Sequence, residues 1–522
     1  MLLQIIRWSI VSLMLSASPV LAAPPNILII YTDDVGYSDV SCYGDGHLQT
    51  PRIDALAESG RRFTRSHAAS ATCTPSRFSI ITGRYPFRND RAEILEGDAP
   101  LLIEPGSLTV ASHLAAAGYH TAVIGKWHLG LGEGEVDWNS DVKPGPLEIG
   151  FDRSYLLPAT GDRVPCVYLD GHRVENLDQN DPLRVSYDGK IGDWPTGTER
   201  PDLLRYPADR QHSGTIVNGV SRIGWQYGGA AALWTDETMV DRFTGRAIEY
   251  IESRAATNTP WFLFFNLHQI HVPRLPGEQF IGRSGLGLRG DAMLEVDWSV
   301  GRLIDALERL GIREDTLVLF SSDNGPVMND GYGDGVLRDK GQHDPNGPYR
   351  GGKYTMWEAG TRVPFIASWP GTIEPGVSNA LMGQIDLLAT LGMIAEAPLD
   401  ELSLAQIDSR DHSLTLLGDN DDGRTTLVTQ GVQGLSIHHK NWKYIAANPA
   451  RRGFANHWST LKHNQVGNPL WSEPIGPGAY LFDLLSDPGE TENLLNAEPE
   501  VAAMLENLLE RIAEDPRAGD GS

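Results

Sequence analysis

Short apolar runs alternate along the chain with segments in which apolar residues recur at helical spacing. Such alternation is typical of α/β proteins, in which buried strands are joined by covering helices. It predicts an α/β fold with a large mixed, mostly parallel sheet flanked by helices. The expected strands are residues 26–31, 121–124, 261–267 and 316–321, and the expected helices are residues 50–56, 107–118, 235–253 and 293–310.

Two regions depart from this alternation. Residues 135–234 are rich in Gly, Pro, Asp and Arg, and we expect them to form long excursions above the sheet. A turn cluster at residues 419–423 precedes two strand-like runs, residues 425–429 and 435–446, and a helix near residues 498–512. The sequence therefore predicts one large domain over residues 23–424, big enough to hold a catalytic site, and a smaller C-terminal α+β subdomain over residues 425–522.

The N-terminus has the pattern of a secretory signal peptide. Arg7 precedes an apolar run from Trp8 to Leu15, and Val20 and Ala22 supply small residues before a cleavage point after Ala22. The alternative is a buried N-terminal helix. No later stretch is long and apolar enough to span a bilayer, and no Cys follows the run to carry a lipid anchor. We expect residues 1–22 to be removed and the protein to be secreted or periplasmic, without a membrane anchor.

The charge balance narrows the range of partners. Among 522 residues, 43 are Lys or Arg and 68 are Asp or Glu, which gives a net charge of −25. So acidic a chain is a poor general binder of nucleic acid or of anionic membranes. The three cysteines, Cys42, Cys73 and Cys166, are too few for a disulfide scaffold, and one thiol must stay unpaired.

Polar pairs follow two of the predicted strands directly. Asp33 and Asp34 come after the first strand, and Asp323 and Asn324 come after the last. In open α/β sheets, ligands bind outside the carboxyl ends of the strands. Three carboxylates and one amide supply oxygen ligands, which suit Ca²⁺ or Mg²⁺. Taken alone, each pair is better explained as a solvated turn, but their shared placement favours a metal site.

Further candidate groups follow other strands or open a helix. Cys73 begins a helix-like run that ends at Gly83, where free N–H groups favour an anion, although a free Cys is more often a small buried apolar residue. Lys126 and His128 are two apart on an extended segment, so they share one face and suit an anionic substrate, or else form an ordinary exposed strand end.

Two more positions complete this set. His268 and His271 follow the strand over residues 261–267, and Lys353 lies in a Gly-rich turn. The simpler interpretations are partly buried histidines with satisfied hydrogen bonds and a solvated lysine.

The order of these motifs resembles a known family. The segment over residues 73–77, Cys-Thr-Pro-Ser-Arg, resembles the first signature of the type I sulfatases, and Gly118-Tyr119 to Gly125-Lys126-Trp127-His128 resembles their second. The His271-Val272-Pro273 step, Gly352-Lys353 and the tail over residues 481–490 follow in the family's order. The resemblance, to the arylsulfatase-like branch of the alkaline-phosphatase superfamily, spans about residues 26–495 and implies an alkaline-phosphatase-like fold.

The resemblance also implies a chemistry. A separate formylglycine-generating enzyme, which recognises C-x-P-x-R, would convert Cys73 to formylglycine (3-oxoalanine), whose hydrate attacks sulfur and then expels sulfate. Conversion would leave Cys42 and Cys166, with the question of a bond between them open. The implied ligands of Ca²⁺ are the side chain of residue 73 with Asp33, Asp34, Asp323 and Asn324.

The family pattern assigns roles to the remaining groups. Arg77 and Lys126 would hold the nucleophile and the anion, and His128 would take the proton from the second hydroxyl. His271 and Lys353 would lie over the sulfate, and one of them would protonate the leaving oxygen. Ca²⁺ and three cationic side chains outweigh three carboxylates, so the site is positive within an acidic chain, as a sulfate monoester requires.

The substrate is less well defined by the sequence. Asp162, Arg163 and His212 are candidates for sugar recognition, and Trp127, Trp225 and Trp234 for stacking on sugar rings, although buried aromatics are more usual. We expect residues 135–234 and the C-terminal subdomain to form the pocket walls, and a sulfated carbohydrate to be the substrate. The alternatives are a phosphonate or phosphate-ester hydrolase of the same superfamily and a catalytically inactive carbohydrate-binding homologue.

Overall fold

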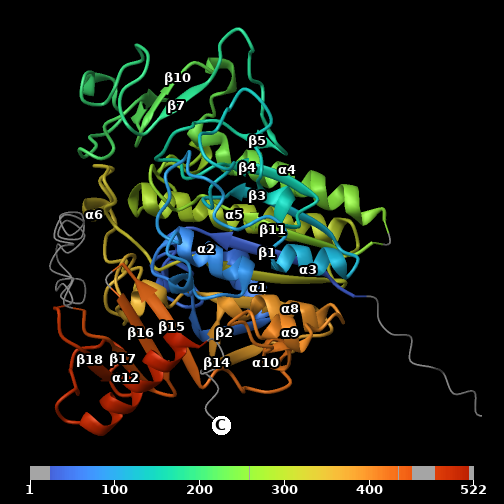
Figure 1. The fold of residues 1–522 in the computed structure, drawn as a ribbon, viewed down its shortest axis with the longest axis vertical. Helices are drawn as coiled ribbons and strands as arrows, with labels where there is room; N and C mark the ends of the chain where they lie inside the picture. The colour runs from blue at the N-terminus through green and yellow to red at the C-terminus, as the bar shows by residue number, and fades with distance from the viewer. Residues whose placement is uncertain (1–23, 258, 433, 449–475, 516–522) are drawn as a thin grey trace, which may run out of the picture.

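A ten-stranded sheet runs through the centre of the molecule (Figure 1). The computed structural model describes residues 24–257, 259–432, 434–448 and 476–515, so the predicted signal peptide, residues 1–22, lies outside the described residues. The strand order is β14-β2-β13-β12-β1-β11-β3-β4-β5-β6. The strands are β1 (Asn26–Thr32), β2 (Arg61–His67), β3 (His120–Lys126), β4 (Arg153–Leu157), β5 (Leu169–Asp170), β6 (Arg173–Val174), β11 (Trp261–Asn266), β12 (Thr316–Ser322), β13 (Phe365–Ser368) and β14 (Gly376–Gly383).

The central strands are parallel and buried on both faces. Strand β1 pairs in parallel with β11 and β12, and β11 pairs in parallel with β3. Alternate residues of β1 enter different cores: Ile27 and Ile29 face one, and Leu28 and Ile30 face the other. Strands that are covered on both faces read as continuous apolar runs, which is why the sequence located them. The predicted fold class is confirmed.

Helices cover the two faces of the sheet (Figure 1). One core contains side chains of α1 (Pro51–Glu58), α4 (Met239–Ala255) and α5 (Gly287–Arg309). The other contains side chains of α2 (Cys73–Thr82), α3 (Val110–Ala116) and α8 (Leu387–Ile394). Four short helices lie in the connections: α6 (Val336–Asp339), α7 (Glu358–Thr361), α9 (Glu401–Leu404) and α10 (Ser413–Leu417).

Three helix starts differ from the prediction. The helix expected from Ser107 begins at Val110, because Thr109 is its N-cap and its hydroxyl accepts a hydrogen bond from Ser112 N at 2.9 Å. The helix expected from Thr235 is preceded by a 3₁₀ turn over Asp236–Thr238, and the α-helical part begins at Met239. The helix expected over residues 293–310 begins earlier, at Gly287.

Three strands on one side of the sheet were not predicted. Strand β2 carries three arginines in its seven residues and has no apolar run. Strand β13 pairs with β2 in antiparallel orientation, and β14 pairs with β2 in parallel orientation. The arginines are partly exposed along β2, while Phe63 is fully buried between its neighbours. Strands near an edge need only a few buried positions, so their sequences lose the apolar density that marks the centre.

The C-terminal part forms a separate antiparallel sheet below the main one (Figure 1). Its strands are β15 (Thr426–Gly431), β16 (Gly434–His439), β17 (Trp442–Ile445) and β18 (Tyr480–Asp483), and α12 (Pro499–Glu514) packs on them. The run over residues 435–446 is two strands rather than one, because a turn at Lys440, with φ of 54°, reverses the chain. The domain boundary after residue 424 stays a prediction.

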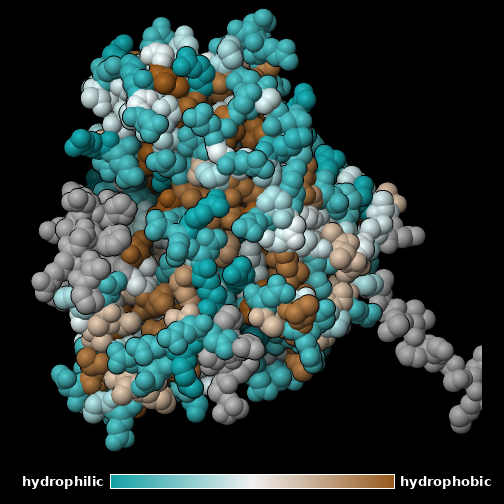
Figure 2. Space-filling model, in the orientation of Figure 1, coloured by the Kyte–Doolittle hydropathy of each residue, from teal (hydrophilic) through white to brown (hydrophobic). Residues whose placement is uncertain are grey.

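The expectation of excursions over residues 135–234 holds only in part, because residues 153–174 supply β4, β5 and β6 of the main sheet. The remaining residues lie past the β4–β5 side of that sheet (Figure 1). They contain β7 (Arg184–Ser186) paired with β10 (Trp225–Tyr227), and β8 (Ile216–Val217) paired with β9 (Val220–Ser221). The surface seen in Figure 2 is mainly hydrophilic over these excursions. Within the described ranges, the structure contains no helix with the length and apolar character needed to cross a membrane.

Candidate active site

The two polar pairs meet at the carboxyl ends of β1 and β12. The strands run in parallel with Thr32 opposite Ser322, so Asp33 and Asp34 lie beside Asp323 and Asn324. All four side chains are fully buried. Asn324 Nδ2 donates to Asp34 Oδ1 at 2.8 Å, and Asp34 N lies 3.4 Å from Asp323 Oδ1. The structure therefore brings together the four strand-end residues among the five predicted metal ligands.

The oxygens of this cluster fit a divalent cation. Asp33 Oδ1 and Asn324 Oδ1 receive no hydrogen bond from any described residue, although both atoms are buried. Buried polar atoms without a partner are rare and need one. Burial, reinforced by Asp323, raises the pKa of Asp33 well above its usual value, and burial likewise raises the pKa of Asp34. A bound Ca²⁺ would keep these carboxylates ionised and would satisfy the two oxygens.

Cys73 lies beside these carboxylates at the start of α2. Its Sγ and carboxylate oxygens of Asp33 and Asp323 lie within 4.8 Å of one another. The helix ends at Gly83, whose φ of 65° suits the left-handed cap. Burial raises the pKa of Cys73 to about 11, so at neutral pH the thiol is protonated and is a weak nucleophile. The position is thus close to the proposed metal but unsuited to thiolate chemistry.

Arg77 and Lys126 place two cations against the carboxylates. Arg77 follows Cys73 by one helical turn and is 1% exposed, and its Nε donates to Asp323 Oδ2 at 3.0 Å. Lys126 ends β3, and its Nζ donates to Asp33 Oδ2 and lies 4.0 Å from Asp323 Oδ2. Because both side chains are buried and bonded to carboxylates, they are fixed in place.

His128 has the geometry of a neutral base. Its backbone is left-handed, with φ of 56°, and Thr74 Oγ1 of α2 donates to its carbonyl at 2.9 Å. Its Nε2 bonds to Leu95 O at 3.0 Å, while its Nδ1 has no hydrogen-bond partner in the described part of the chain. Burial, together with the nearby charge of Lys126, holds the pKa of His128 well below its usual value, so the ring is neutral.

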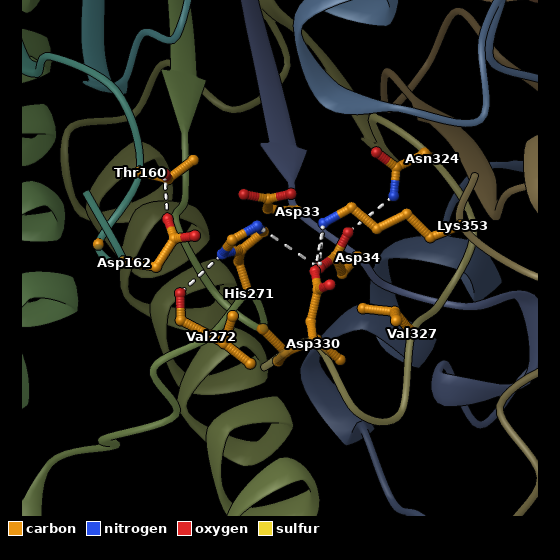
Figure 3. Close-up of polar contacts among 12 residues, drawn as sticks. Asp33, Asp34, Thr160, Asp162, His271, Val272, Asn324, Val327, Asp330 and Lys353 are labelled. Atoms are coloured by element: carbon orange, nitrogen blue, oxygen red, sulfur yellow. Dashed lines mark hydrogen bonds and ion pairs between the residues drawn. The ribbon is translucent and has the colours of Figure 1, made fainter. Parts of the chain in front are cut away.

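His271 and Lys353 face the same carboxylate, Asp34 (Figure 3). His271 Nδ1 bonds to Val272 O at 2.7 Å, and its Nε2 lies 4.0 Å from Asp34 Oδ2. Lys353 Nζ donates to Asp34 Oδ2 at 3.0 Å. Burial holds the pKa of His271 well below its usual value, with further lowering from Lys353. For Lys353, the neighbouring carboxylates outweigh burial and raise its pKa.

His268 lies outside the cavity. Its Nε2 accepts a hydrogen bond from Gly161 N at 2.8 Å, so the ring fixes the turn that carries Asp162. A Cβ at Gly161 would come within 2.8 Å of this ring, which explains the glycine. The structure therefore supports the choice of His271 over His268 as the group that faces the substrate.

A cavity of about 680 Å³ opens above these groups. It is lined by predicted catalytic groups and by the three predicted sugar-binding residues, Asp162, Arg163 and His212. His212 Nε2 lies 3.3 Å from Asp162 Oδ2, and its Nδ1 lies 2.8 Å from Asp209 Oδ1. These bonds outweigh burial and raise the pKa of His212 to about 9, so it is a cation at neutral pH.

Several expectations about the pocket walls were wrong. Trp127 and Trp234 are buried in the two cores, where Trp127 Nε1 donates to Gly130 O at 2.8 Å, so neither can stack on a sugar. Half-buried Trp225 packs in β10 and does not line the cavity. Residues 135–234 do line the cavity as predicted, through Thr160, Asp162, Arg163, residues 209–212 and Ile223, together with Ile94, Glu96, Asp330 and Tyr354 from other segments. Among the described residues, the C-terminal subdomain adds none.

Three cavity residues escaped the sequence analysis. Asp209, Asp330 and Tyr354 line the cavity and contact predicted site residues. Asp330 lies in an Asn-Asp-Gly turn and Asp209 in a polar loop, where carboxylates are common. Tyr354 directly follows Lys353, which is the one local signal that could have identified it.

The cysteines do not pair. Cys42, Cys73 and Cys166 are all free thiols in the structure, so the bond between Cys42 and Cys166 that the sequence left open is not formed.

Comparisons with known proteins agree with this geometry. The sulfatase family model matches residues 25–397. An N-acetylgalactosamine-6-O-sulfatase from Bacteroides thetaiotaomicron is 43% identical over 94% of this chain and 93% of its own length. Human arylsulfatase A is 34% identical over 95% of this chain and 89% of its own length.

Two solved structures resemble this chain along nearly its whole length. One from work on the metabolism of multiple glycosaminoglycans by Bacteroides thetaiotaomicron matches with a TM-score of 0.89 at 43% identity, covering 94% of this chain and 100% of that one. A sulfatase from Pseudoalteromonas sp. matches with a TM-score of 0.66 at 24% identity, covering 96% of this chain and 92% of that one, and supports the fold alone.

Proposed function

The chain belongs to the sulfatase family, whose members are sulfuric ester hydrolases, and on that premise we propose that it removes sulfate from a sulfated glycosaminoglycan sugar, 6-O-sulfated N-acetylgalactosamine. The proposal depends above all on the position of Cys73, which lies against Asp33 and Asp323 and lines one cavity together with His128, His271 and Lys353. The sugar rests on the similarity to the Bacteroides enzyme, which extends along nearly the whole of both chains.

Two groups would complete the site. Formylglycine made from Cys73 would, as its hydrate, supply a nucleophile with two hydroxyls on one carbon, in place of the protonated thiol. Ca²⁺ held by Asp33, Asp34, Asp323 and Asn324 would supply charge stabilisation at the sulfate oxygens. The segment Cys73-Thr74-Pro75-Ser76-Arg77 has the residues that the maturation enzyme recognises.

The residues of the chain position and stabilise the reacting groups. Arg77 and Lys126, each bonded to a ligand carboxylate, present fixed positive charge to the sulfate oxygens. Such charge is effective in a buried site because it is already oriented before the reaction begins. Neutral His128 accepts a proton at Nδ1, the nitrogen that its bond to Leu95 leaves free.

His271 and Lys353, which line the cavity, are the candidates to act on the leaving oxygen. His271 is held by Val272 through Nδ1, which directs Nε2 toward Asp34 and the cavity. Lys353 carries a fixed ammonium beside it. We infer that these two groups lie over the ester oxygen and that His271, once the bound sulfate anion favours its charged form, donates its Nε2 proton to that oxygen, while Asp162, Arg163 and His212 contact the sugar.

A panel of substrates tests the proposal. The protein is produced with a formylglycine-generating enzyme, and sulfate release is measured from N-acetylgalactosamine 6-sulfate, its 4-sulfate isomer and 6-O-sulfated N-acetylglucosamine. The 6-sulfated galacto sugar should give the highest kcat/KM. The matched control, Cys73→Ala, should release no sulfate while keeping the thermal unfolding temperature. Preference for either other sugar would overturn the proposed substrate.

The same-superfamily alternative predicts a different result. A phosphate or phosphonate hydrolase would show a higher kcat/KM for a phosphate ester than for a sulfate ester with the same leaving group. The site has an amide, Asn324, where a two-metal site would place another carboxylate, which favours one Ca²⁺ and a singly charged ester. An inactive carbohydrate-binding homologue would bind the sugars and release nothing.

Export belongs to the same proposal. We infer that the protein is secreted or periplasmic, because residues 1–22 have the pattern of a signal peptide. N-terminal sequencing of the mature protein should start at Ala23. Retention of Met1 in the exported fraction would contradict cleavage.

A further inference from the structure

Asp330 contacts Lys353 (Figure 3), and it also contacts Tyr354, the next residue in the chain. Lys353 Nζ donates to Asp330 Oδ2 at 3.1 Å, and Tyr354 Oη lies 2.9 Å from each carboxylate oxygen of Asp330. The exposed fractions of Lys353 and Asp330 are 2% and 7%. Two adjacent side chains thus hold one carboxylate that comes from a different loop.

The ammonium of Lys353 needs a contact that fixes its position. Its side chain is long and flexible, and it follows Gly351 and Gly352, whose φ angles are 86° and 154°. The backbone there does little to fix the ammonium. Asp34 also contacts the ammonium, but Asp34 accepts a hydrogen bond from Asn324 and belongs to the proposed metal cluster. Asp330 is outside the proposed metal cluster, and its other partner is Tyr354, so it can hold Lys353 without a competing metal contact.

Asp330 itself lies on a fastened segment. Arg274 donates to the carbonyls of Val327 and Met328 at 2.9 and 3.1 Å, and to Asp334 Oδ2 at 2.6 Å. Arg274 is 2% exposed, so these bonds are shielded from water. The loop is therefore held at points on both sides of Asp330, independently of Lys353.

A second metal ion does not suit this place. Oxygen and nitrogen atoms of Asp34, His271 and Asp330 lie within 4.8 Å of one another. However, the ammonium of Lys353 contacts both carboxylates, at 3.0 and 3.1 Å. It therefore already occupies the place beside them that a second metal ion would take.

We propose that Asp330 is a positioning residue, which holds the ammonium of Lys353 over the ester oxygens while Tyr354 fixes the orientation of Asp330. The inference rests on the proposed role of Lys353 at the leaving group. Its consequence is that Asp330 contributes to catalysis through Lys353 and not by touching the substrate.

A double-mutant cycle tests this. Asp330→Asn should lower kcat/KM for a sulfate ester about 30-fold, mostly through kcat, because the residue it removes orients a group that acts in the transition state. In the Lys353→Met background, the same change should cost less than about threefold. Asp330→Glu, which keeps the carboxylate, should retain more activity than Asp330→Asn.

The matched control is Asp386→Asn. It breaks a buried carboxylate–cation pair with Arg424, outside the loop that carries Asp330, and should cost the same factor with and without Lys353. Asp334 is unsuitable as a control because it fastens that loop. Unfolding temperature and calcium content are measured for each variant. If Asp330→Asn does not fold, Tyr354→Phe replaces it, with an expected loss of about fivefold that also vanishes in the Lys353→Met background.

The outcomes separate the two claims. Equal losses from Asp330→Asn in both backgrounds would overturn the positioning role. If Lys353→Met alone left kcat unchanged, the proposed role of Lys353 would fail, and this inference with it. A loss of bound calcium in Asp330→Asn would show that the residue serves the metal cluster and would also overturn the inference.

Discussion

At the level of single residues, two neutral histidines face the cavity with different ring nitrogens. His128 leaves Nδ1 without a partner among the described residues, whereas His271 is bonded through Nδ1 and directs Nε2 inward. His271→Ala should lower kcat/KM at least about 100-fold for sulfated sugars but less than about tenfold for aryl sulfates with good leaving groups, because only the sugars need protonation of the leaving oxygen.

The control for this prediction is His128→Ala, which should slow both substrate classes to a similar degree, since it serves a later step common to both. Steady-state kinetics on matched sugar and aryl sulfates provides the measurement. Equal losses for both classes in His271→Ala would remove the histidine from the leaving-group step.

A pH effect follows from His212. Its hydrogen bonds to Asp162 and Asp209 raise its pKa to about 9 in the folded protein, against about 6.5 in the unfolded chain. The charged ring therefore contributes full stability below pH of about 6.5, and this contribution is lost as the pH rises through about 9. The free energy of unfolding of wild type minus that of His212→Gln should fall by up to about 3 kcal/mol over that range.

Chemical denaturation of wild type and of His212→Gln at several pH values measures this difference in the free energy of unfolding. Using the difference between the two proteins cancels other titrating groups. A difference that stays constant between pH 6 and 10 would mean that His212 is not held as a cation by these carboxylates.

The sequence placed most of the site but missed its supporting groups. Asp33, Asp34, Asp323 and Asn324 could be predicted because they follow apolar strands whose ends must meet. Asp330 lies in a polar loop with no such constraint, so its contact with Lys353 depends on how distant segments pack. When the role of a residue depends on contacts with distant segments, the neighbouring sequence contains no pattern that predicts that role.

At the level of elements, the close approach of β3 and β11 positions Lys126. Gly125 has φ of 112°, and a Cβ there would lie 1.8 Å from the carbonyl oxygen of Asn266 on β11. Gly125→Ala should therefore separate the strands, lower the free energy of unfolding by more than about 2 kcal/mol, and reduce kcat by displacing Lys126. Thermal unfolding and steady-state kinetics measure both effects.

Gly245→Ala on α4 is the matched control, because open space surrounds that position. It should stabilise the protein by about 0.5 to 1 kcal/mol, as expected when Ala replaces Gly within a helix. A Gly125→Ala variant as stable as wild type would show that the strands can part without cost.

The elements themselves were predicted unevenly. Central strands such as β1 and β11 were found because both faces are covered, whereas the arginine-rich β2 was missed because partial exposure removes the apolar run. The start of α3 shifted because two capping residues, Ser107 and Thr109, compete there.

At the level of the whole molecule, a buried ionic cluster joins the main sheet to the C-terminal sheet. Glu358 of α7 accepts hydrogen bonds from Arg362 at 3.0 Å and from Lys443 of β17 at 3.1 Å, and Lys443 also contacts Glu490 at 2.8 Å. Glu358, Lys443 and Glu490 are fully buried. The C-terminal subdomain therefore supports the fold, even though none of its described residues lines the cavity.

Glu358→Gln should reveal this cluster's contribution. Removing one partner of a buried pair leaves the cations uncompensated, so the free energy of unfolding should fall by about 3 to 5 kcal/mol. Asp202→Asn, which removes a solvent-exposed pair with Arg200, should leave the free energy of unfolding nearly unchanged. Equal, small effects in urea denaturation would mean that the cluster does not tie the two sheets together.

The central claim is that residue 73 acts as formylglycine, and mass spectrometry of the tryptic peptide over residues 66–77 tests it most directly. The protein is produced with the maturation enzyme and digested. The account predicts a peptide in which one oxygen replaces the sulfur and two hydrogens are lost, at a level that follows the sulfatase activity across preparations. An active preparation that contains only unmodified Cys73 would contradict it.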